Sequence, residues 1–258
     1  MADAHHGLAS EQEARDVAEA ARESEWTQPS FLQELFLGRF RPEIIHPYPA
    51  DDPEETERAK PFFDALRDYL ERYPSDEIDR TGEIPEPLVQ ELREMGAFGI
   101  KIPREYGGLG LSQTSYIRAM GMVTSRDGSL TALLSAHQSI GLPQPLKLFG
   151  TTAQKEKYFP RLAKGAISAF ALTEVDAGSD PANMRTSAVP TEDGQAFILN
   201  GQKLWCTNGT RAELILVMAR TPDAMVHGKP KKQITAIIVE TSWPGGEVVH
   251  RCRFMGLK

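Results

Sequence analysis

The sequence predicts an α+β protein in which an all-helical bundle domain is followed by an antiparallel β-barrel domain. Two patterns predict this order. Up to about residue 165, apolar residues recur every three or four positions, as they do on one face of a helix. After Lys164 the pattern changes to short runs rich in β-branched and aromatic residues, separated by turn residues. We therefore expect an acidic N-terminal extension at residues 1–55, the helical domain at 56–165 and the β-barrel domain at 166–258.

The helical half contains several segments with recognisable start and stop signals. Between Glu54 and Tyr73, the apolar residues at positions 62, 66, 69 and 70 fall on one helical face. A helix is expected from Pro87 to Gly96, because proline is favoured in the first turn and glycine after the last. Further helices are expected from the cap residue Ser112 to Val123, at 129–147, at 152–162 and, in the extension, from the capping-box pair Ser10 and Glu13 to about Glu25.

The second half contains short runs that are typical of strands. Asn200-Gly201, which separates two of these runs, is a strong hairpin signal and predicts a two-residue turn. Because side chains alternate along a strand, Trp205 and Thr207 would then share one face, with Cys206 on the other. The runs lie at residues 167–174, 196–200, 202–207, 214–220, 234–240 and 247–252.

The composition is that of an ordinary globular protein and excludes several other classes. The chain has 258 residues, 40% hydrophobic and 25% charged, and no apolar run reaches the roughly 18 residues of a membrane span. Residues 1–60 contain 14 acidic and 6 basic residues, whereas the remaining 198 contain 22 and 23. No basic stripe is therefore available for nucleic acid. The two cysteines make no disulfide framework and the start of the chain has no secretory signal, so we expect a cytoplasmic protein.

Most isolated polar residues have a simple structural interpretation. His5 and His6 have no spaced partner ligands, so we expect no metal site. His137 lies in an apolar helical stretch and is expected to be a packing residue. The glycines at 107–110 follow no strand and so do not form a dinucleotide fingerprint. The loop at 174–180 is more informative, because it follows a strand and offers backbone N–H groups and a serine hydroxyl to an anionic or carbonyl ligand group.

Four motifs, in this order, resemble the acyl-CoA dehydrogenase family. They are PREYGGLGLS at 103–112, FGTTAQKEKYFPRLAKG at 149–165, FALTEVDAGSD at 170–180 and LNGQKLWCTNG at 199–209. The resemblance runs from Pro61 to Lys258, and the preceding residues are similar to an extension found in some longer bacterial members. It implies a helical N-terminal domain, a middle β-barrel domain and a C-terminal four-helix domain, with FAD between the middle domain and the helices.

The resemblance also implies which residues contact the cofactor. Ser179 matches a serine that touches both FAD and the acyl-CoA ligand. Trp205 and Thr207 match residues that lie against the isoalloxazine ring. The implied cofactor-binding positions come from both β motifs: Phe170, Leu172, Thr173, Gly178, Ser179, Trp205, Cys206 and Thr207.

The implied reaction is the α,β-dehydrogenation of an acyl-CoA thioester. A carboxylate removes the α proton while a hydride moves to the flavin. In the family that carboxylate belongs to a Glu of the C-terminal domain, which this chain does not contain, and Glu174 matches a structural acidic residue instead. We therefore expect no catalytic residue here and an inactive isolated chain. The implied partners are the acyl-CoA substrate, an electron-transfer flavoprotein as acceptor and further copies of the full-length protein.

Two other functions stay open at this point. The chain could be a non-catalytic flavin- or acyl-CoA-binding subunit whose partner brings the base, or part of a flavin oxidase or monooxygenase, which oxygen consumption would reveal. The acyl chain length is not fixed by the sequence, although the extension and the helix pattern favour longer or bulkier substrates. A barrel cut before its last strands leaves unpaired edges, so we expect the isolated chain to associate or to be poorly soluble.

Overall fold

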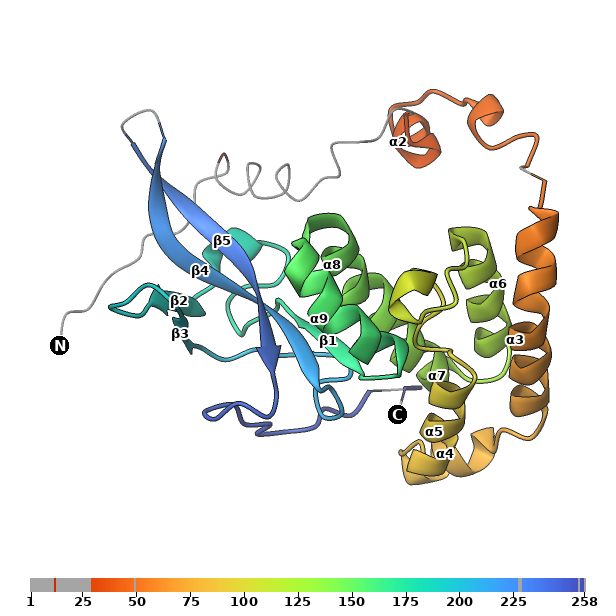
Figure 1. Cartoon of the computed structure of the whole chain (residues 1–258). Helices are drawn as coiled ribbons and strands as arrows, with labels where there is room; N and C mark the ends of the chain where they lie inside the picture. The colour runs from red at the N-terminus through yellow and green to blue at the C-terminus, as the bar shows by residue number, and fades with distance from the viewer. Residues whose placement is uncertain (1–11, 13–28, 49, 227–228, 255, 258) are drawn as a thin grey trace.

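The computed structural model describes residue 12 and residues 29–48, 50–226, 229–254 and 256–257. Helices α3 to α9 gather on one side of the molecule and the strands on the other, which confirms the α+β class (Figure 1). Apart from Gln12, which is helical, the helix predicted from Ser10 to Glu25 lies outside the described residues. The helices are α2 Phe31–Phe36, α3 Pro53–Glu71, α4 Ser75–Thr81, α5 Glu86–Glu94, α6 Gln113–Thr124, α7 Gly128–Ser135, α8 Pro143–Phe149 and α9 Thr152–Ala163, with short helical turns η1 Pro42–Ile44, η2 Arg104–Tyr106, η3 Ala136–Ile140 and η4 Pro181–Asn183.

Local signals explain where the helices begin. At the start of α3, the Asp52 carboxylate accepts a hydrogen bond of 2.9 Å from the backbone N–H of Glu54, which satisfies one of the donors that a helix start leaves unpaired. At α9, Thr151 and Gln154 form a complete capping box. The apolar stripe predicted for α3 is confirmed, because its buried side chains are Ala59, Phe62, Leu66, Tyr69 and Leu70.

Two buried apolar clusters hold the chain together. The larger lies within the helical half and includes Leu66, Leu92 and Phe98, each at most 1% exposed. The second joins α8 and α9 to the sheet, since Phe159 packs in the same cluster as Leu214 of β4. Burial of such side chains is the main favourable term in folding. The sheet therefore has a fixed position against the last two helices.

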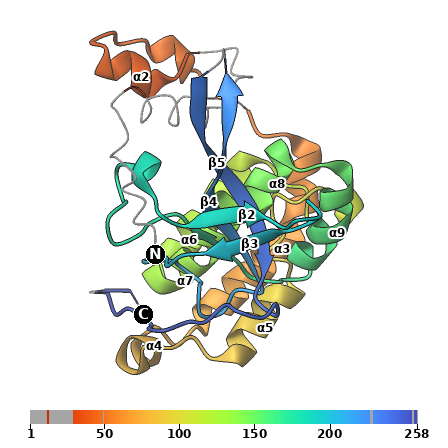
Figure 2. The ribbon, with the colours of Figure 1, turned by 90° about the vertical axis from the view of Figure 1, so that its left-hand side faces the viewer.

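The strands form a mixed sheet, and the antiparallel barrel predicted from the sequence is not confirmed. β1 Ser168–Ala171 runs parallel to β4 Leu214–Val226, which pairs antiparallel with β5 Lys229–Glu240. β2 Ser187–Pro190 meets β4 in parallel and pairs antiparallel with β3 Phe197–Asn200 (Figure 2). Within the described part of the chain the sheet order is β1-β4-β2-β3, with β5 beside β4 and no closure. Alternation along a strand records which face is buried but not the direction of its neighbour, so the sequence pattern left this point undetermined.

The hairpin predicted at Asn200-Gly201 is wrong. β3 instead pairs back with β2, and the turn between them contains Asp193-Gly194, where the glycine has a φ of 67°. The backbone N–H of Thr191 donates to the carbonyl of Ala196 at 2.9 Å and closes this turn. Asp-Gly is an equally strong hairpin signal, so the sequence contained the correct turn as well as the wrong one. The strands predicted at 202–207 and 247–252 do not form.

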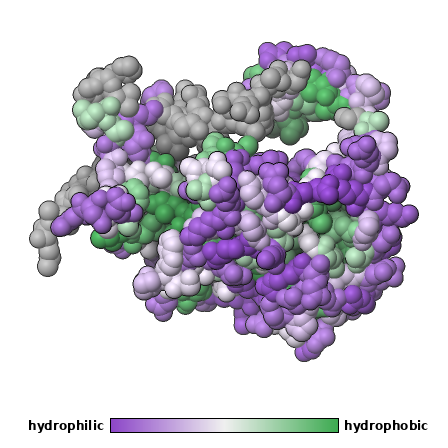
Figure 3. Space-filling model, viewed as in Figure 1, coloured by the Kyte–Doolittle hydropathy of each residue, from purple (hydrophilic) through white to green (hydrophobic). Residues whose placement is uncertain are grey.

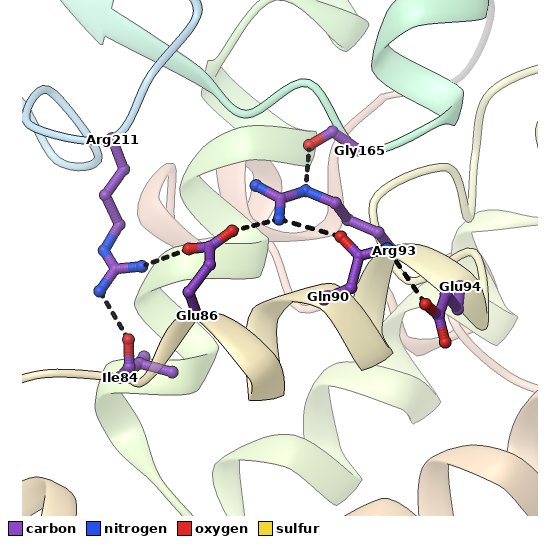
Figure 4. Close-up of polar contacts among 7 residues, drawn as sticks. All are labelled: Ile84, Glu86, Gln90, Arg93, Glu94, Gly165 and Arg211. Atoms are coloured by element: carbon purple, nitrogen blue, oxygen red, sulfur yellow. Dashed lines mark hydrogen bonds and ion pairs between the residues drawn. The ribbon is translucent and has the colours of Figure 1, made fainter.

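A polar network joins the helical half to the chain just before β4 (Figure 4). Arg93 of α5 donates to the carbonyl of Gly165 at 3.2 Å and pairs with Glu86. Glu86 also pairs with Arg211 at 3.4 Å, and Arg211 donates to the carbonyl of Ile84 at 2.6 Å. The two arginines thus anchor both the end of α9 and the segment that enters β4.

Hydrophobic side chains remain exposed on the extension and on the outer strands (Figure 3). Phe36 of α2 is 90% exposed and Ile198 of β3 is 63% exposed. In the described part of the chain, no helix combines the length and the apolar character needed to cross a bilayer.

Candidate functional site

Two segments that are about thirty residues apart in the sequence lie side by side at the end of β1. The backbone N–H of Leu204 donates to the carbonyl of Thr173 at 2.8 Å. Two residues further on, the Cys206 thiol donates to the carbonyl of Phe170 at 3.5 Å. These contacts join residues 170–174 to residues 203–208, which the sequence placed in two separate motifs. The structure therefore brings together most of the predicted site residues.

Trp205 lies between these two contacts in the sequence, and its backbone departs from that of a strand. Its backbone is left-handed, with a φ of 55°, and its side chain is 57% exposed. Such a conformation interrupts the alternation of a strand. The strand register that predicted a shared face for Trp205 and Thr207 therefore does not exist, although both side chains are exposed. The Trp205 ring lies 5.6 Å from the ring of Phe254, centroid to centroid.

The remaining predicted residues lie at the end of β1 and on the loop that follows it. Phe170, Leu172 and Thr173 are partly buried, whereas Gly178 and Ser179 are exposed. The loop is closed at its base, because the backbone N–H of residue 174 donates to the carbonyl of residue 177 at 2.8 Å. The loop after β1 thus has two exposed residues, Gly178 and Ser179, and the second of them carries a hydroxyl.

Glu174 is a buried structural carboxylate, as the motif implied. It accepts hydrogen bonds from the Lys203 ammonium at 2.7 Å and from the backbone N–H groups of Arg185 and Thr186 at 2.5 and 3.0 Å. Burial alone would raise its pKa, but the ammonium and the two N–H groups outweigh burial and lower the pKa to about 2. A carboxylate with so low a pKa is a poor proton acceptor at neutral pH. Glu174 is therefore unsuited to act as the base.

A second buried group fixes the start of β1. His137 is fully buried in η3, its Nδ1 accepts from the backbone N–H of Ser168 at 3.0 Å, and its Nε2 lies 3.0 Å from the carbonyl of Phe98. Burial lowers the pKa of His137 to about 4, so the ring is neutral and its Nε2 donates to Phe98. The packing role predicted for His137 is confirmed, and the ring connects the helices to β1.

Sequence reasoning missed two polar residues that shape this region. Lys203 contacts Leu172 and Glu174, and Asn208 donates to the carbonyls of Leu133 and Ser168 at 2.9 and 3.3 Å. A lysine directly before the apolar run Leu204-Trp205-Cys206 was the available signal for the first. The left-handed φ of 67° at Asn208 is a conformation that asparagine tolerates well, and the Asn-Gly pair at that position was its signal.

Two cavities lie beside α3 and α6. One of about 370 Å³ lies between α3 and α6 beside Phe63 and Met122, and a second of about 190 Å³ adjoins it. Neither contains a predicted site residue. Among the residues that the structure describes, no three metal-ligating side chains cluster. The candidate site lies at the end of β1 and is built from two chain segments.

Comparison with known proteins places the chain in a family. The family model for the acyl-CoA dehydrogenase N-terminal domain matches residues 56–166, and the model for the middle domain matches residues 169–258. A protein named probable acyl-CoA dehydrogenase FadE10, from Mycobacterium tuberculosis (strain ATCC 25618 / H37Rv), is 52% identical over 248 residues. This match covers 96% of the chain, and so extends into its N-terminal extension, but only 38% of the relative.

Two solved structures of acyl-CoA dehydrogenases are also similar to this chain. Butyryl-CoA dehydrogenase from Megasphaera elsdenii matches with a TM-score of 0.65 and 32% identity, over 77% of this chain and 51% of that one. An acyl-CoA dehydrogenase from Bacillus anthracis, solved in complex with FAD, matches with a TM-score of 0.60 and 33% identity, over 76% of this chain and 32% of that one. The chain spans 38% of the length of the curated relative above. On the evidence of its sequence and its fold, the chain belongs to the acyl-CoA dehydrogenase family.

Proposed function

We propose that this chain supplies the flavin- and thioester-binding half of an FAD-dependent acyl-CoA dehydrogenase. The observation that carries the proposal is the meeting of residues 170–174 with residues 203–208, because both β motifs of the resemblance contribute to one surface. The FAD in the related Bacillus anthracis structure supports the choice of cofactor. We also propose the domain limits stated above, at residues 1–55, 56–165 and 166–258.

The side chains at this surface fit a flavin ring. Trp205 presents an exposed aromatic ring on which a flat heterocycle can stack. Thr173 and Thr207 are not buried, so their hydroxyls can donate to ring atoms whose electron density rises on reduction. We assign the cofactor contacts to Phe170, Leu172, Thr173, Gly178, Ser179, Trp205, Cys206 and Thr207.

The proposed reaction is the removal of hydrogen from the α and β carbons of an acyl-CoA. FAD, when bound, supplies the hydride acceptor. Ser179 lies on the exposed loop after β1 and would donate its hydroxyl to the cofactor and to the thioester ligand. We assign the proton abstraction to a residue outside this chain, because Glu174 already accepts three hydrogen bonds.

The partners follow from the same reaction. We propose an acyl-CoA substrate, an electron-transfer flavoprotein as electron acceptor, a homo-oligomer for the full-length protein and a cytoplasmic location. A second candidate is a binding subunit without catalysis of its own, and the engagement of Glu174 in structural bonds favours it for the chain alone. Flavin retention without reduction by added acyl-CoA would distinguish this candidate from an active enzyme.

Flavin retention tests the proposal directly. The purified chain is incubated with FAD and desalted, and its visible absorption is recorded beside those of Trp205→Ala and Trp243→Ala. Trp243 is a matched control because it is 48% exposed in the turn after β5 and is not among the residues assigned to the cofactor. We expect the wild type and the control to retain FAD and Trp205→Ala to lose it. Equal retention by all three chains would contradict the assignment of Trp205, and no retention by the wild type would contradict the proposal for this chain.

A further inference from the structure

We propose that Lys203 and Glu174 are positioning residues, whose ion pair fixes the separation between residues 170–174 and residues 203–207. These are the two segments assigned above to the flavin, so the consequence for FAD rests on the proposed function. The ion pair itself and its effect on the two segments rest only on the geometry of the chain.

The Lys203 ammonium connects the two segments directly. Its Nζ donates to the carbonyl of Leu172 at 3.0 Å and to the Glu174 carboxylate at 2.7 Å. The Lys203 side chain is only 11% exposed and that of Glu174 only 7%. A buried charge that loses its partner is strongly destabilising, because the remaining charge stays out of water without compensation. The pair therefore strongly opposes any separation of the two segments.

Glu174 extends the connection to the rest of the sheet. Its carboxylate accepts from the backbone N–H groups of Arg185 and Thr186, immediately before β2. The carbonyl of Thr186 in turn accepts from the N–H of Arg220 in β4 at 2.8 Å. Lys203 is thus linked through one carboxylate to β2 and β4. It positions residues 203–207 against strands that are hydrogen-bonded to one another and not against a free loop.

The chain at Gly201 passes very close to Thr186. A Cβ added at Gly201 would lie 2.3 Å from the Thr186 hydroxyl oxygen and 2.7 Å from the Thr186 Cα. Only glycine permits this approach. Residues 201–203 are therefore held by the contact of Gly201 with Thr186 and by the ion pair of Lys203 with Glu174. Trp205 follows two residues later.

The position of Trp205 depends on the contacts that its neighbours in the chain make with residues 170–174. The N–H of Leu204 bonds to Thr173 and the thiol of Cys206 bonds to Phe170, while Trp205 between them is left-handed and exposed. The ring itself is 57% exposed and packs against the ring of Phe254, which belongs to neither of the two segments. The position of the ring relative to residues 170–174 is therefore set by the contacts on either side and by the Lys203–Glu174 pair.

The reactivity of Cys206 tests the proposal without any flavin. Cys206 and Cys252 are both free thiols, so a Cys252→Ser background leaves Cys206 as the single reporter. Lys203→Met removes the ammonium but keeps the length of the side chain, and Lys157→Met is the matched control because Lys157 pairs with Glu240 at 2.9 Å on the surface. We expect Lys203→Met to speed the reaction of Cys206 with a disulfide reagent by about 10- to 100-fold, the change produced by loss of a charged hydrogen bond. Lys157→Met should leave the rate within about twofold, as expected for a surface ion pair.

Two further measurements separate local opening from general unfolding. In a Cys206→Ser background, Cys252 becomes the reporter, and its rate should be the same with Lys203 or Met at position 203. Faster labelling of both cysteines would overturn the proposal, as would equal Cys206 rates in Lys203→Met and Lys157→Met. If Lys203→Met has lost its far-ultraviolet circular dichroism signal, this variant is unfolded, and Glu174→Gln is used in its place. Glu174→Gln removes the negative charge of the ion pair and keeps the shape of the side chain. An unchanged Cys206 rate in that variant would likewise overturn the proposal.

FAD titration then connects the pair to the cofactor. We expect the dissociation constant for FAD to rise by about tenfold or more in Lys203→Met and to stay unchanged in Lys157→Met. If the wild-type chain binds no FAD, the proposed function fails for this chain, while the thiol rates still decide the role of the pair. If FAD binds equally to both variants although Cys206 opens, the pair does not position the flavin site and the inference is overturned.

Discussion

Acidification should destabilise the folded chain through His137. This ring is fully buried, accepts a hydrogen bond from Ser168 at Nδ1 and donates one to Phe98 from Nε2. A second proton on Nδ1 would point at the backbone N–H of Ser168 and would place a charge in an apolar interior. The neutral ring therefore persists in the folded state at a pH where the same side chain is protonated in the unfolded chain.

The size of the effect follows from the two pKa values. The pKa of His137 is about 4 in the folded chain, against an ordinary value of 6.5. One pKa unit corresponds to about 1.4 kcal/mol, so His137 should cost about 3 kcal/mol of unfolding free energy once the pH has fallen from above 6.5 to about 4. The sign follows because the unfolded chain binds the extra proton first. Above pH 6.5 the effect is absent.

Urea unfolding followed by circular dichroism measures this loss. Unfolding free energies are compared at pH 7.5, 6, 5 and 4.5 for the wild type and for His137→Gln, which cannot titrate. We expect the difference between the two chains to shrink steadily as the pH falls through this range. Parallel pH profiles would refute the reasoning, because they would mean that the ring is protonated equally in both states.

Other substitutions have expected effects on the unfolding free energy in urea. Gly201→Ala should cost about 1 to 3 kcal/mol, because its Cβ would lie 2.3 Å from the Thr186 hydroxyl oxygen. Gly121→Ala, in α6 with nothing within 4 Å, should instead stabilise by up to about 1 kcal/mol. Asn208→Ala removes hydrogen bonds to two backbone carbonyls and should cost about 1 to 3 kcal/mol, with Asn208→Gly as the control for its left-handed backbone. Leu66→Ala should cost about 2 to 5 kcal/mol, because the side chain is 1% exposed in the main core. An effect within 0.5 kcal/mol of zero at Leu66, Gly201 or Asn208, or destabilisation by Gly121→Ala, would contradict the packing described.

Acid should also act through Glu174, in a lower pH window. Its pKa is about 2 in the folded chain, and the ordinary value is 4.5. Because the folded pKa is depressed, the stabilisation is complete above pH 4.5 and is lost as the pH falls toward 2. Glu174→Gln should therefore flatten the stability profile below pH 4.5 and leave the His137 window unchanged.

The helical half could be predicted from the sequence because its signals are local. The stripe of Phe62, Leu66, Tyr69 and Leu70 predicted the buried face of α3, and Ser112 predicted the start of α6. For α9 the sequence predicted Thr152 as the cap, whereas the cap is the preceding residue, Thr151. Each of these signals acts within one or two helical turns. The candidate site residues were named for a different reason, namely the resemblance of their motifs to a family.

The sheet could not be predicted in the same way because its contacts are not local. Two turn signals, Asp193-Gly194 and Asn200-Gly201, lie seven residues apart, and only the first closes a hairpin. At the second signal, Gly201 lies against Thr186, and the chain continues past β2 to the end of β1, where Leu204 bonds to Thr173. Which of two good turns forms depends on what lies against each, and a local pattern does not contain that information.

The sequence by itself determined the α+β class, the buried faces of the helices and the family to which the chain belongs. Only the tertiary structure decided that β1 runs parallel to β4, that Trp205 is left-handed and exposed, and that Lys203 pairs with Glu174. The physical reason is the range of the interactions. Helix caps and apolar stripes act between near neighbours in the chain, whereas the ion pair joins residues 29 positions apart and forms only when the sheet has brought them together.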